Sequence, residues 1–247
     1  MSRAARLRLF LTAAAVLAAA LIAAATELPR FGGNHHPYGE RAVAAGLAQR
    51  TANIVSSVNF DQRAFDTLGE ESILFGSVLG AGMLLRLARD EHKRRAAAEP
   101  VLPTTRLFGA TLLPVTLLVG GYLVAHGQLS PGGGFQGGVA LATALHLAYV
   151  AADYLVLKRI RPLAVLDVAE AVAAGSYAAL GLIGLVQGAG YLANTLPLGT
   201  FNQMSSSGLV AVVNAAVGVE VASGVVVLLA HFLDQAVEIA PRGEGGE

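Results

Sequence analysis

Long apolar stretches dominate this chain and restrict it to a membrane. A helix needs about 20 apolar residues to cross a bilayer, and six stretches reach that length. They are, in chain order, Leu7–Leu28, Leu68–Leu87, Leu107–Ala125, Phe135–Val156, Ala164–Gln187 and Gly208–Leu233. Charged residues make up only 14% of the chain, against about 25% in a soluble domain. The sequence therefore predicts an all-α polytopic membrane protein with six transmembrane helices.

Lysine and arginine side chains gather on one side of these stretches. Of the 17 basic residues, 13 lie before the first stretch, in the second and fourth connections, or after the last stretch. The remaining four lie in one long loop on the opposite side. Because cytoplasmic loops collect positive charge, both termini are expected in the cytoplasm. An alternative for the first stretch is a cleaved signal peptide that ends at the small residues 23–25.

A charged segment that ends in prolines divides the chain. Residues 90–99 mix acidic and basic side chains, and Pro100 and Pro103 follow. Two of the expected spans precede this boundary and four follow it. We expect a two-span segment over residues 1–99, a four-span domain over residues 100–236 and a cytoplasmic tail over residues 237–247.

The loop between the first two spans is too long for a bare connection. Within residues 29–66, mostly apolar side chains recur at the spacing that places them on one face of a helix. They are Val43, Leu47, Thr51, Ile54 and Val58. This pattern predicts an amphipathic helix that lies at the outer membrane interface or against another protein of a complex.

The sequence contains no pattern for enzymatic chemistry, a metal or a cofactor. Cysteine is absent, which excludes disulfides, thiolate metal sites and iron–sulfur ligation. The 17 acidic residues balance the 17 basic ones, so there is no net charge to attract nucleic acid. We expect a non-enzymatic protein, with translocation as its one possible activity, and with the lipid bilayer as its surroundings.

Ionisable residues inside the apolar stretches are candidates for an ion or proton path. Glu220 lies near the middle of the last stretch, Glu170 lies in the fifth and His146 lies in the fourth. A charge at the bilayer centre costs at least about 2.5–3.5 kcal/mol, so such residues commonly carry protons or ions. For His146, a hydrogen-bonded core position is the stronger alternative.

Acidic residues also mark the outer mouth of the second span. Thr67 and Glu70 have the spacing of a capping box, in which Thr67 caps the helix and Glu70 bonds back to the cap amide. A carboxylate at this depth can also collect or relay cations or protons, so Asp66 and Glu70 are path candidates. Glu71 is expected on a different, solvated face.

A glycine-rich segment precedes the fourth span. Residues 130–138 read Ser-Pro-Gly-Gly-Gly-Phe-Gln-Gly-Gly. Glycine permits positive φ and lets another chain segment approach closely, so we expect a sharp bend here. Ser130 is expected to cap a helix whose first residue is Pro131. A phosphate-binding loop is excluded because no Lys-Ser or Lys-Thr pair follows.

This segment resembles the signature of the MrpB/MnhB family, the B-type component of the multisubunit Mrp/Mnh-type sodium/proton antiporters. The residues that carry the resemblance are Pro131, Gly132, Gly133, Gly134, Phe135, Gly137 and Gly138. The likeness covers about residues 104–235. Gln128 stands where that family usually has a histidine, and the family's aspartate in the last span falls at Ala216, about one turn before Glu220.

Residues 53–85 are similar to the C-terminal end of the large A-type component of the same complexes. In membrane-bound hydrogenases this C-terminal end is a separate small protein. The matching residues are Phe65, Asp66, Thr67, Gly69 and Glu70. The chain thus resembles a fusion, with its seam near residues 99–103. The two resemblances imply an accessory subunit of a Na+/H+ antiporter complex in the prokaryotic cell membrane, with the other subunits as partners. The alternatives are a membrane-arm subunit of a hydrogenase or related complex I-like oxidoreductase, and a purely structural scaffold.

The asymmetry of basic residues leads to a topology prediction. A reporter fused after Arg95 should give a cytoplasmic signal, and one inserted between residues 32 and 53 should give an external signal. Paired fusions to alkaline phosphatase and green fluorescent protein measure both. An external signal after Arg95 would contradict the six-span topology.

Overall fold

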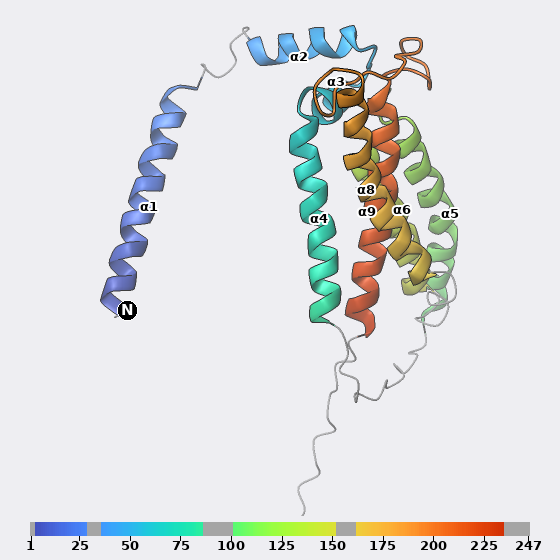
Figure 1. Cartoon of the computed structure of the whole chain (residues 1–247). Coiled ribbons are helices and arrows are strands. Elements are labelled where there is room, and N and C mark those ends of the chain that lie inside the picture. Colours follow the sequence, from blue (N-terminus) through green and yellow to red (C-terminus); the bar gives the residue numbers. More distant parts are fainter. Residues whose placement is uncertain (1–2, 29–35, 86–100, 152–161, 235–247) are drawn as a thin grey trace, which may run out of the picture. The chain divides into compact units, whose positions relative to one another are not determined.

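The computed structural model describes residues 3–28, 36–85, 101–151 and 162–234, and these residues form helices and turns without any strand. The chain divides into two units, residues 1–40 and residues 41–247. The first unit holds helix α1 (Arg3–Thr26), in which no residue is buried. The second unit holds the helical bundle of Figure 1.

The described helices confirm an all-α polytopic membrane protein. Those of the second unit are α4 (Ala64–Leu84), α5 (Pro103–Ala125), α6 (Gly134–Ala151), α8 (Leu163–Val186) and α9 (Leu209–Asp234). Five of the described helices are long and apolar enough to cross a membrane, namely α1, α5, α6, α8 and α9.

Helix α4 corresponds to the second predicted span but is less apolar than the others. Its 21 residues rise by about 31 Å at 1.5 Å per residue, which matches a hydrocarbon core about 30 Å thick. Glu70 and Glu71 lower its mean hydropathy. The length of α4 is therefore that of a span, and its acidic residues are what set it apart.

Helix α9 lies at the centre of the second unit. It packs against α4, α5, α6 and α8. The valines on its inner faces are fully buried, with 0% exposure for Val210, Val213, Val217 and Val221. Any polar residue on these faces of α9 is consequently removed from both water and lipid.

Glycines on two faces of α6 allow close approach to both of its neighbours. A Cβ atom at Gly137 would lie 2.5 Å from Cγ2 of Val124, on the α5 side. A Cβ atom at Gly138 would lie 2.7 Å from Cβ of Val221 on α9. Small residues at such contacts are what allow tight helix packing in lipid.

The long outer connection contains helix α2 (Pro37–Ala48), helix α3 (Ile54–Ser57) and a π-helical turn, η1 (Val58–Gln62). The helix expected in this loop is present as α2, but it ends at Ala48 and does not continue to residue 58. Arg50, with a φ of 55°, turns the chain, and the Asn53 side chain caps a new helix by accepting a hydrogen bond from the amide of Ser56.

The residues of α2 that pack against the protein are its small ones. Val43 and Leu47 are 43% and 51% exposed, whereas Ala42 and Gly46 are buried. A Cβ atom at Gly46 would lie 2.7 Å from Cδ1 of Ile54. The small residues therefore make the protein contact, because α3 approaches too closely for a larger side chain.

Replacement of Gly137 should destabilise the bundle. In Gly137→Ala the new methyl group meets the Val124 side chain and the backbone carbonyl of Gly120, 2.9 Å away, and overpacking of this kind costs about 1–3 kcal/mol. We expect reduced abundance and a lower melting temperature for the detergent-solubilised protein. Gly121→Ala is the matched control, because no atom lies within 4 Å of its Cβ position.

Candidate functional site

Three glutamates are buried where α4, α8 and α9 meet. Glu71 on α4 and Glu170 on α8 are each 3% exposed, and Glu220 on α9 is 0% exposed. Among the described residues, no hydrogen-bond partner is present for Oε2 of Glu71, Oε1 of Glu170 or either carboxylate oxygen of Glu220. Buried polar groups normally have partners, so this group of oxygens needs an explanation.

The three carboxylates follow one another along the seam between α4, α8 and α9. Glu220 is close enough to interact electrostatically with Glu71 and with Glu170. Oε1 of Glu170 would lie 2.8 Å from a Cβ atom at Gly224, one turn after Glu220 on α9. Gly224 thus leaves room for the Glu170 carboxylate.

His231 continues this series on α9. Its Nε2 would lie 2.9 Å from a Cβ atom at Gly82 on α4. Gly224 follows Glu220 by four residues and His231 follows Gly224 by seven, so all three share one face of α9. The titratable groups of this seam, in order from the start of α4, are Glu71, Glu220, Glu170 and His231.

These side chains form a series rather than a metal site. No group of three or more His, Asp or Glu side chains in the described part of the chain is arranged to hold a metal ion. Chelation needs ligands that converge on one point, and the described side chains of the seam do not converge in this way.

The structure brings together only some of the residues singled out in the sequence. Glu170 and Glu220 both lie in the seam. Glu70 and Asp66 are exposed, and Asp66 accepts a hydrogen bond of 2.6 Å from Nε of Arg63. His146 is half-buried on α6, whose neighbours are α5 and α9.

The orientation of α4 corrects two expectations. Arg63 is the N-cap residue and makes no side-chain cap bond, so the capping box of Thr67 and Glu70 is wrong. Thr67 lies one turn inside the helix, where its hydroxyl donates to the carbonyl of Asn59 at 2.7 Å. Glu71, four residues on, shares this inner face, and the expectation that it is solvated is therefore also wrong.

Glu71 and His231 belong to this series, although the sequence did not predict either of them as a path residue. Thr67, Glu71 and Val78 have the spacing of one helix face and are all buried. Likewise His231 is three helical turns after Glu220 on α9. Helical spacing from Glu220 would have selected His231, whereas spacing shows only that Glu71 shares a face with Thr67 and Val78.

The glycine-rich segment forms the turn before α6. Gly132 and Gly133 have φ values of 127° and 144°, a region that only glycine adopts readily. The helix begins at Gly134, so the expected start at Pro131 is wrong. Phe135 is 45% exposed on the bundle surface.

Asn214 of α9 binds the first residue of this helix. Its Oδ1 accepts a hydrogen bond of 2.9 Å from the amide of Gly134. Its Nδ2 donates to Oγ of Ser56 at 2.7 Å and to the carbonyl of Val210 at 3.0 Å. One buried amide thereby joins α3, α6 and α9.

Asn53 makes a second connection to the same turn. Its Nδ2 donates to the carbonyls of Gly127 and Ser130, at 2.7 Å and 2.8 Å. Gln128 in this turn is 2% exposed and donates to the carbonyl of Met204 at 3.1 Å. The segment around Asn53 and the glycine-rich segment are therefore parts of one packed structure. By contrast, nothing lies within 4 Å of a Cβ position at Gly69.

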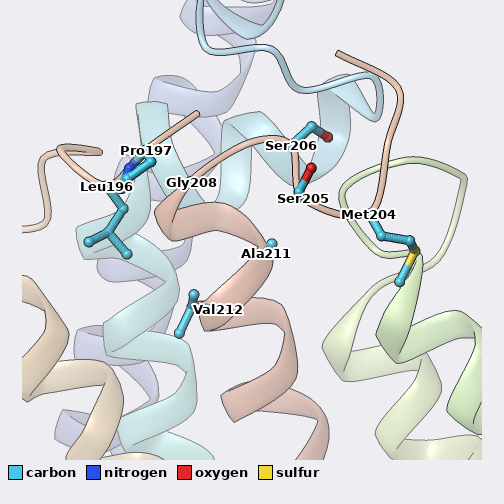
Figure 2. A pocket seen from close by; sticks show the side chains of 8 residues that line it. All are labelled: Leu196, Pro197, Met204, Ser205, Ser206, Gly208, Ala211 and Val212. Atoms are coloured by element: carbon cyan, nitrogen blue, oxygen red, sulfur yellow. The ribbon is translucent and has the colours of Figure 1, made fainter. Parts of the chain in front are cut away.

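Figure 2 shows a hollow of about 310 Å³ at the start of α9. Leu196 and Pro197 lie on one side and Met204 on the other, and Ala211 and Val212 line it from the helix. Its other lining residues are Ser205, Ser206 and Gly208. No lining residue is titratable, so this hollow has no group that could exchange a proton.

Comparison with known sequences defines the class of the protein. Residues 104–227 match the family described as a domain related to the MnhB subunit of Na+/H+ antiporter. The match spans half of the chain, and the protein belongs to this family.

Two curated proteins are similar to this chain in sequence. The uncharacterized protein MJ1307 of Methanocaldococcus jannaschii is 28% identical over 201 residues, which cover 70% of this chain and 73% of that protein. A probable K+/H+ antiporter A/B subunit of Rhizobium meliloti is 30% identical over 120 residues, which cover 40% of this chain and 12% of that protein.

Two solved membrane complexes contain chains of the same fold. A chain of the archaeal membrane-bound sulfane sulfur reductase, a respiratory complex, has a TM-score of 0.71 at 27% identity, covering 92% of this chain and 98% of that one. A chain of the Mrp complex from Dietzia has a TM-score of 0.66 at 21% identity, covering 98% of this chain and 27% of that one.

The Asn214 contacts lead to a prediction about stability. Asn214→Ala leaves the amide of Gly134 and the hydroxyl of Ser56 without this partner, and such a loss costs about 1–3 kcal/mol at a buried site. We expect lower abundance and a lower melting temperature. Gln203→Ala, in the exposed turn before α9, is the control and should change neither. Normal stability of Asn214→Ala would show that the amide does not hold the three helices together.

Proposed function

We propose that this protein is a membrane subunit of a multisubunit cation/proton antiporter complex of the Mrp type in a prokaryotic cell membrane. Membership in the MnhB-related family supports this proposal, as do the antiporter relative and the Mrp complex of the same fold. Its partners are then the other subunits of that complex, and Na+ and H+ are the transported ions. The chain catalyses no reaction of its own and contributes to translocation.

The contribution that the geometry supports best is a proton relay along the α4–α8–α9 seam. The observation that carries it is the series of three carboxylates, Glu71, Glu220 and Glu170, with buried oxygens that lack partners in the described residues. Burial of charge in a membrane is costly, and leaving a carboxylate unpartnered adds to that cost. Three such residues in one seam are therefore better explained by transport than by packing.

Proton transfer fits this series better than binding of Na+ along it. Na+ needs several oxygen ligands around one point, whereas the seam offers carboxylates one after another. Each transfer protonates the accepting carboxylate and leaves the donor ionised, so one proton advances by one site. His231 extends the series toward the end of α9 with a second type of proton carrier.

The exposed acidic residues have a different place in this proposal. Glu70 and Asp66 lie outside the seam, so any path through them needs groups from another protein of the complex. His146 on α6 lies apart from the seam as well. We therefore place the relay of this chain in the seam and leave the exposed carboxylates to contacts within the complex.

A second candidate is a membrane-arm subunit of a redox-driven complex. The chain of the sulfane sulfur reductase supports it, because it is matched over 98% of its length. In that case the seam would serve the same proton transfer, driven by oxidation and reduction in partner subunits. Purification of the intact complex separates the two, since iron–sulfur absorbance in the co-purifying subunits would indicate the redox assembly.

Neutralisation of the buried carboxylates tests the relay. Glu71→Gln, Glu220→Gln and Glu170→Gln each preserve side-chain size but cannot exchange a proton, so we expect cation-dependent proton flux to fall at least about ten-fold. The measurement uses membrane vesicles with an acridine dye, and complex abundance is determined in parallel. Glu40→Gln, an exposed substitution on α2, is the control and should leave flux unchanged.

Glu70→Gln provides the comparison between neighbouring residues. If flux depends on the seam, Glu71→Gln should lose far more of it than Glu70→Gln at equal abundance. Full flux in Glu71→Gln together with loss in Glu70→Gln would reject the seam and assign the path to the exposed face of α4.

A further inference from the structure

A second hollow, of about 310 Å³, lies where η1 meets α4. Its lining includes Asp61, Ala64 and Tyr191, together with Asp66 and the Arg63 guanidinium that pairs with it. Asp61 belongs to the π-helical turn, a type of element that is frequent at functional sites. Burial raises the pKa of the Asp61 carboxyl above its usual range. This hollow is at the end of the bundle that the basic residues assign to the outside.

One wall of this hollow is closed from behind by Tyr177 of α8. Ala64 is 3% exposed, and its carbonyl accepts a hydrogen bond of 2.9 Å from the Tyr177 hydroxyl. The ring of Tyr177 is 0% exposed and packs against Phe60 of η1, with 6.4 Å between ring centroids. Tyr177 thus fills the space between α8 and the junction of η1 with α4.

The same tyrosine lies near the first carboxylate of the series. Tyr177 is within electrostatic range of Glu71 and Glu220. Glu71 follows Ala64 by seven residues, or about 10 Å along α4 at 1.5 Å per residue. Tyr177 therefore bonds to the wall of the hollow at Ala64 and also lies within range of Glu71.

We propose that Tyr177 is a positioning residue that separates the outer hollow from the buried carboxylates, and that a proton reaches Glu71 when this hydroxyl releases the Ala64 carbonyl. The inference rests on the proposed relay and adds its outer entrance. A second bond, from Thr67 to the carbonyl of Asn59, holds the same junction closed. Asp61 then supplies the proton at the entrance.

The hydrogen bond from the Tyr177 hydroxyl to the Ala64 carbonyl is weak enough to break during transport. A single neutral hydrogen bond is worth about a five-fold ratio of populations. Removal of the hydroxyl should therefore favour the open arrangement by about that factor, without removing the ring that packs against Phe60. This separates the role of the bond from the role of the packing.

The test is passive proton leak through the intact complex in membrane vesicles. In Tyr177→Phe we expect an imposed pH gradient, with no exchangeable cation present, to decay about five-fold faster per complex than in the parent. The leak should return to the parent rate in the double variant Tyr177→Phe/Glu71→Gln. Ser176→Ala is the matched control, because it removes a neighbouring hydroxyl whose bond, within the described residues, goes to the carbonyl of Ala173 in its own helix.

Each outcome decides the inference. An unchanged leak in Tyr177→Phe overturns it, and so does a leak that persists in the double variant. If Tyr177→Phe does not accumulate, Thr67→Val replaces it, because it loosens the same junction, and an unchanged leak there overturns the inference as well. Normal exchange in the single variant Glu71→Gln rejects the relay. Loss of exchange in Glu71→Gln, combined with an unchanged leak in Tyr177→Phe, rejects the entrance but not the relay.

Discussion

The side chain of Asn214 holds the second unit together. It satisfies the amide at the start of α6, the hydroxyl of Ser56 and the carbonyl of Val210, in a place where no water is available to replace any of them. The bonds fix the start of α6 beside α9 and the start of α3 beside both. Because these contacts define one side of α9, the opposite side is left to α4 and α8, and the carboxylate series lies there.

Much of the fold could be predicted from hydropathy, since the described apolar helices end within a few residues of the expected stretches. Glu170 and Glu220 were selected because a charge inside an apolar stretch is conspicuous. The orientation of α4 could not be predicted in this way. Glu70 and Glu71 point about 100° apart, and both faces of the helix are apolar, so composition does not say which residue faces α9. That is decided by the contact of Thr67 with Asn59 and by helix packing.

For the glycine-rich segment, too, one part of the structure could be predicted from the sequence and another part could not. Its need for glycine was evident from its sequence, whereas its partners were not, because Asn53 and Asn214 lie about 80 residues away on either side. Its first helical residue was misplaced because Asn214, rather than Ser130, satisfies the amide at the helix start. The segments that resemble two different antiporter components belong to a single unit here, and Asn53 directly joins them.

The glycines of α6 have a mechanical consequence. Where backbones touch without intervening side chains, as α6 does with α5 and α9, one helix cannot slide or rotate without collision, so these three helices form a stiff frame. Helix α4 has no such contact with α9 along its first half, where larger side chains such as Glu71 separate the two. A side chain at a helix contact can change its rotamer and make room, whereas two backbones in contact cannot adjust in this way. The compliant part of the unit is therefore the α4 side, and elastic deformation during a transport cycle would concentrate there while the frame keeps its shape.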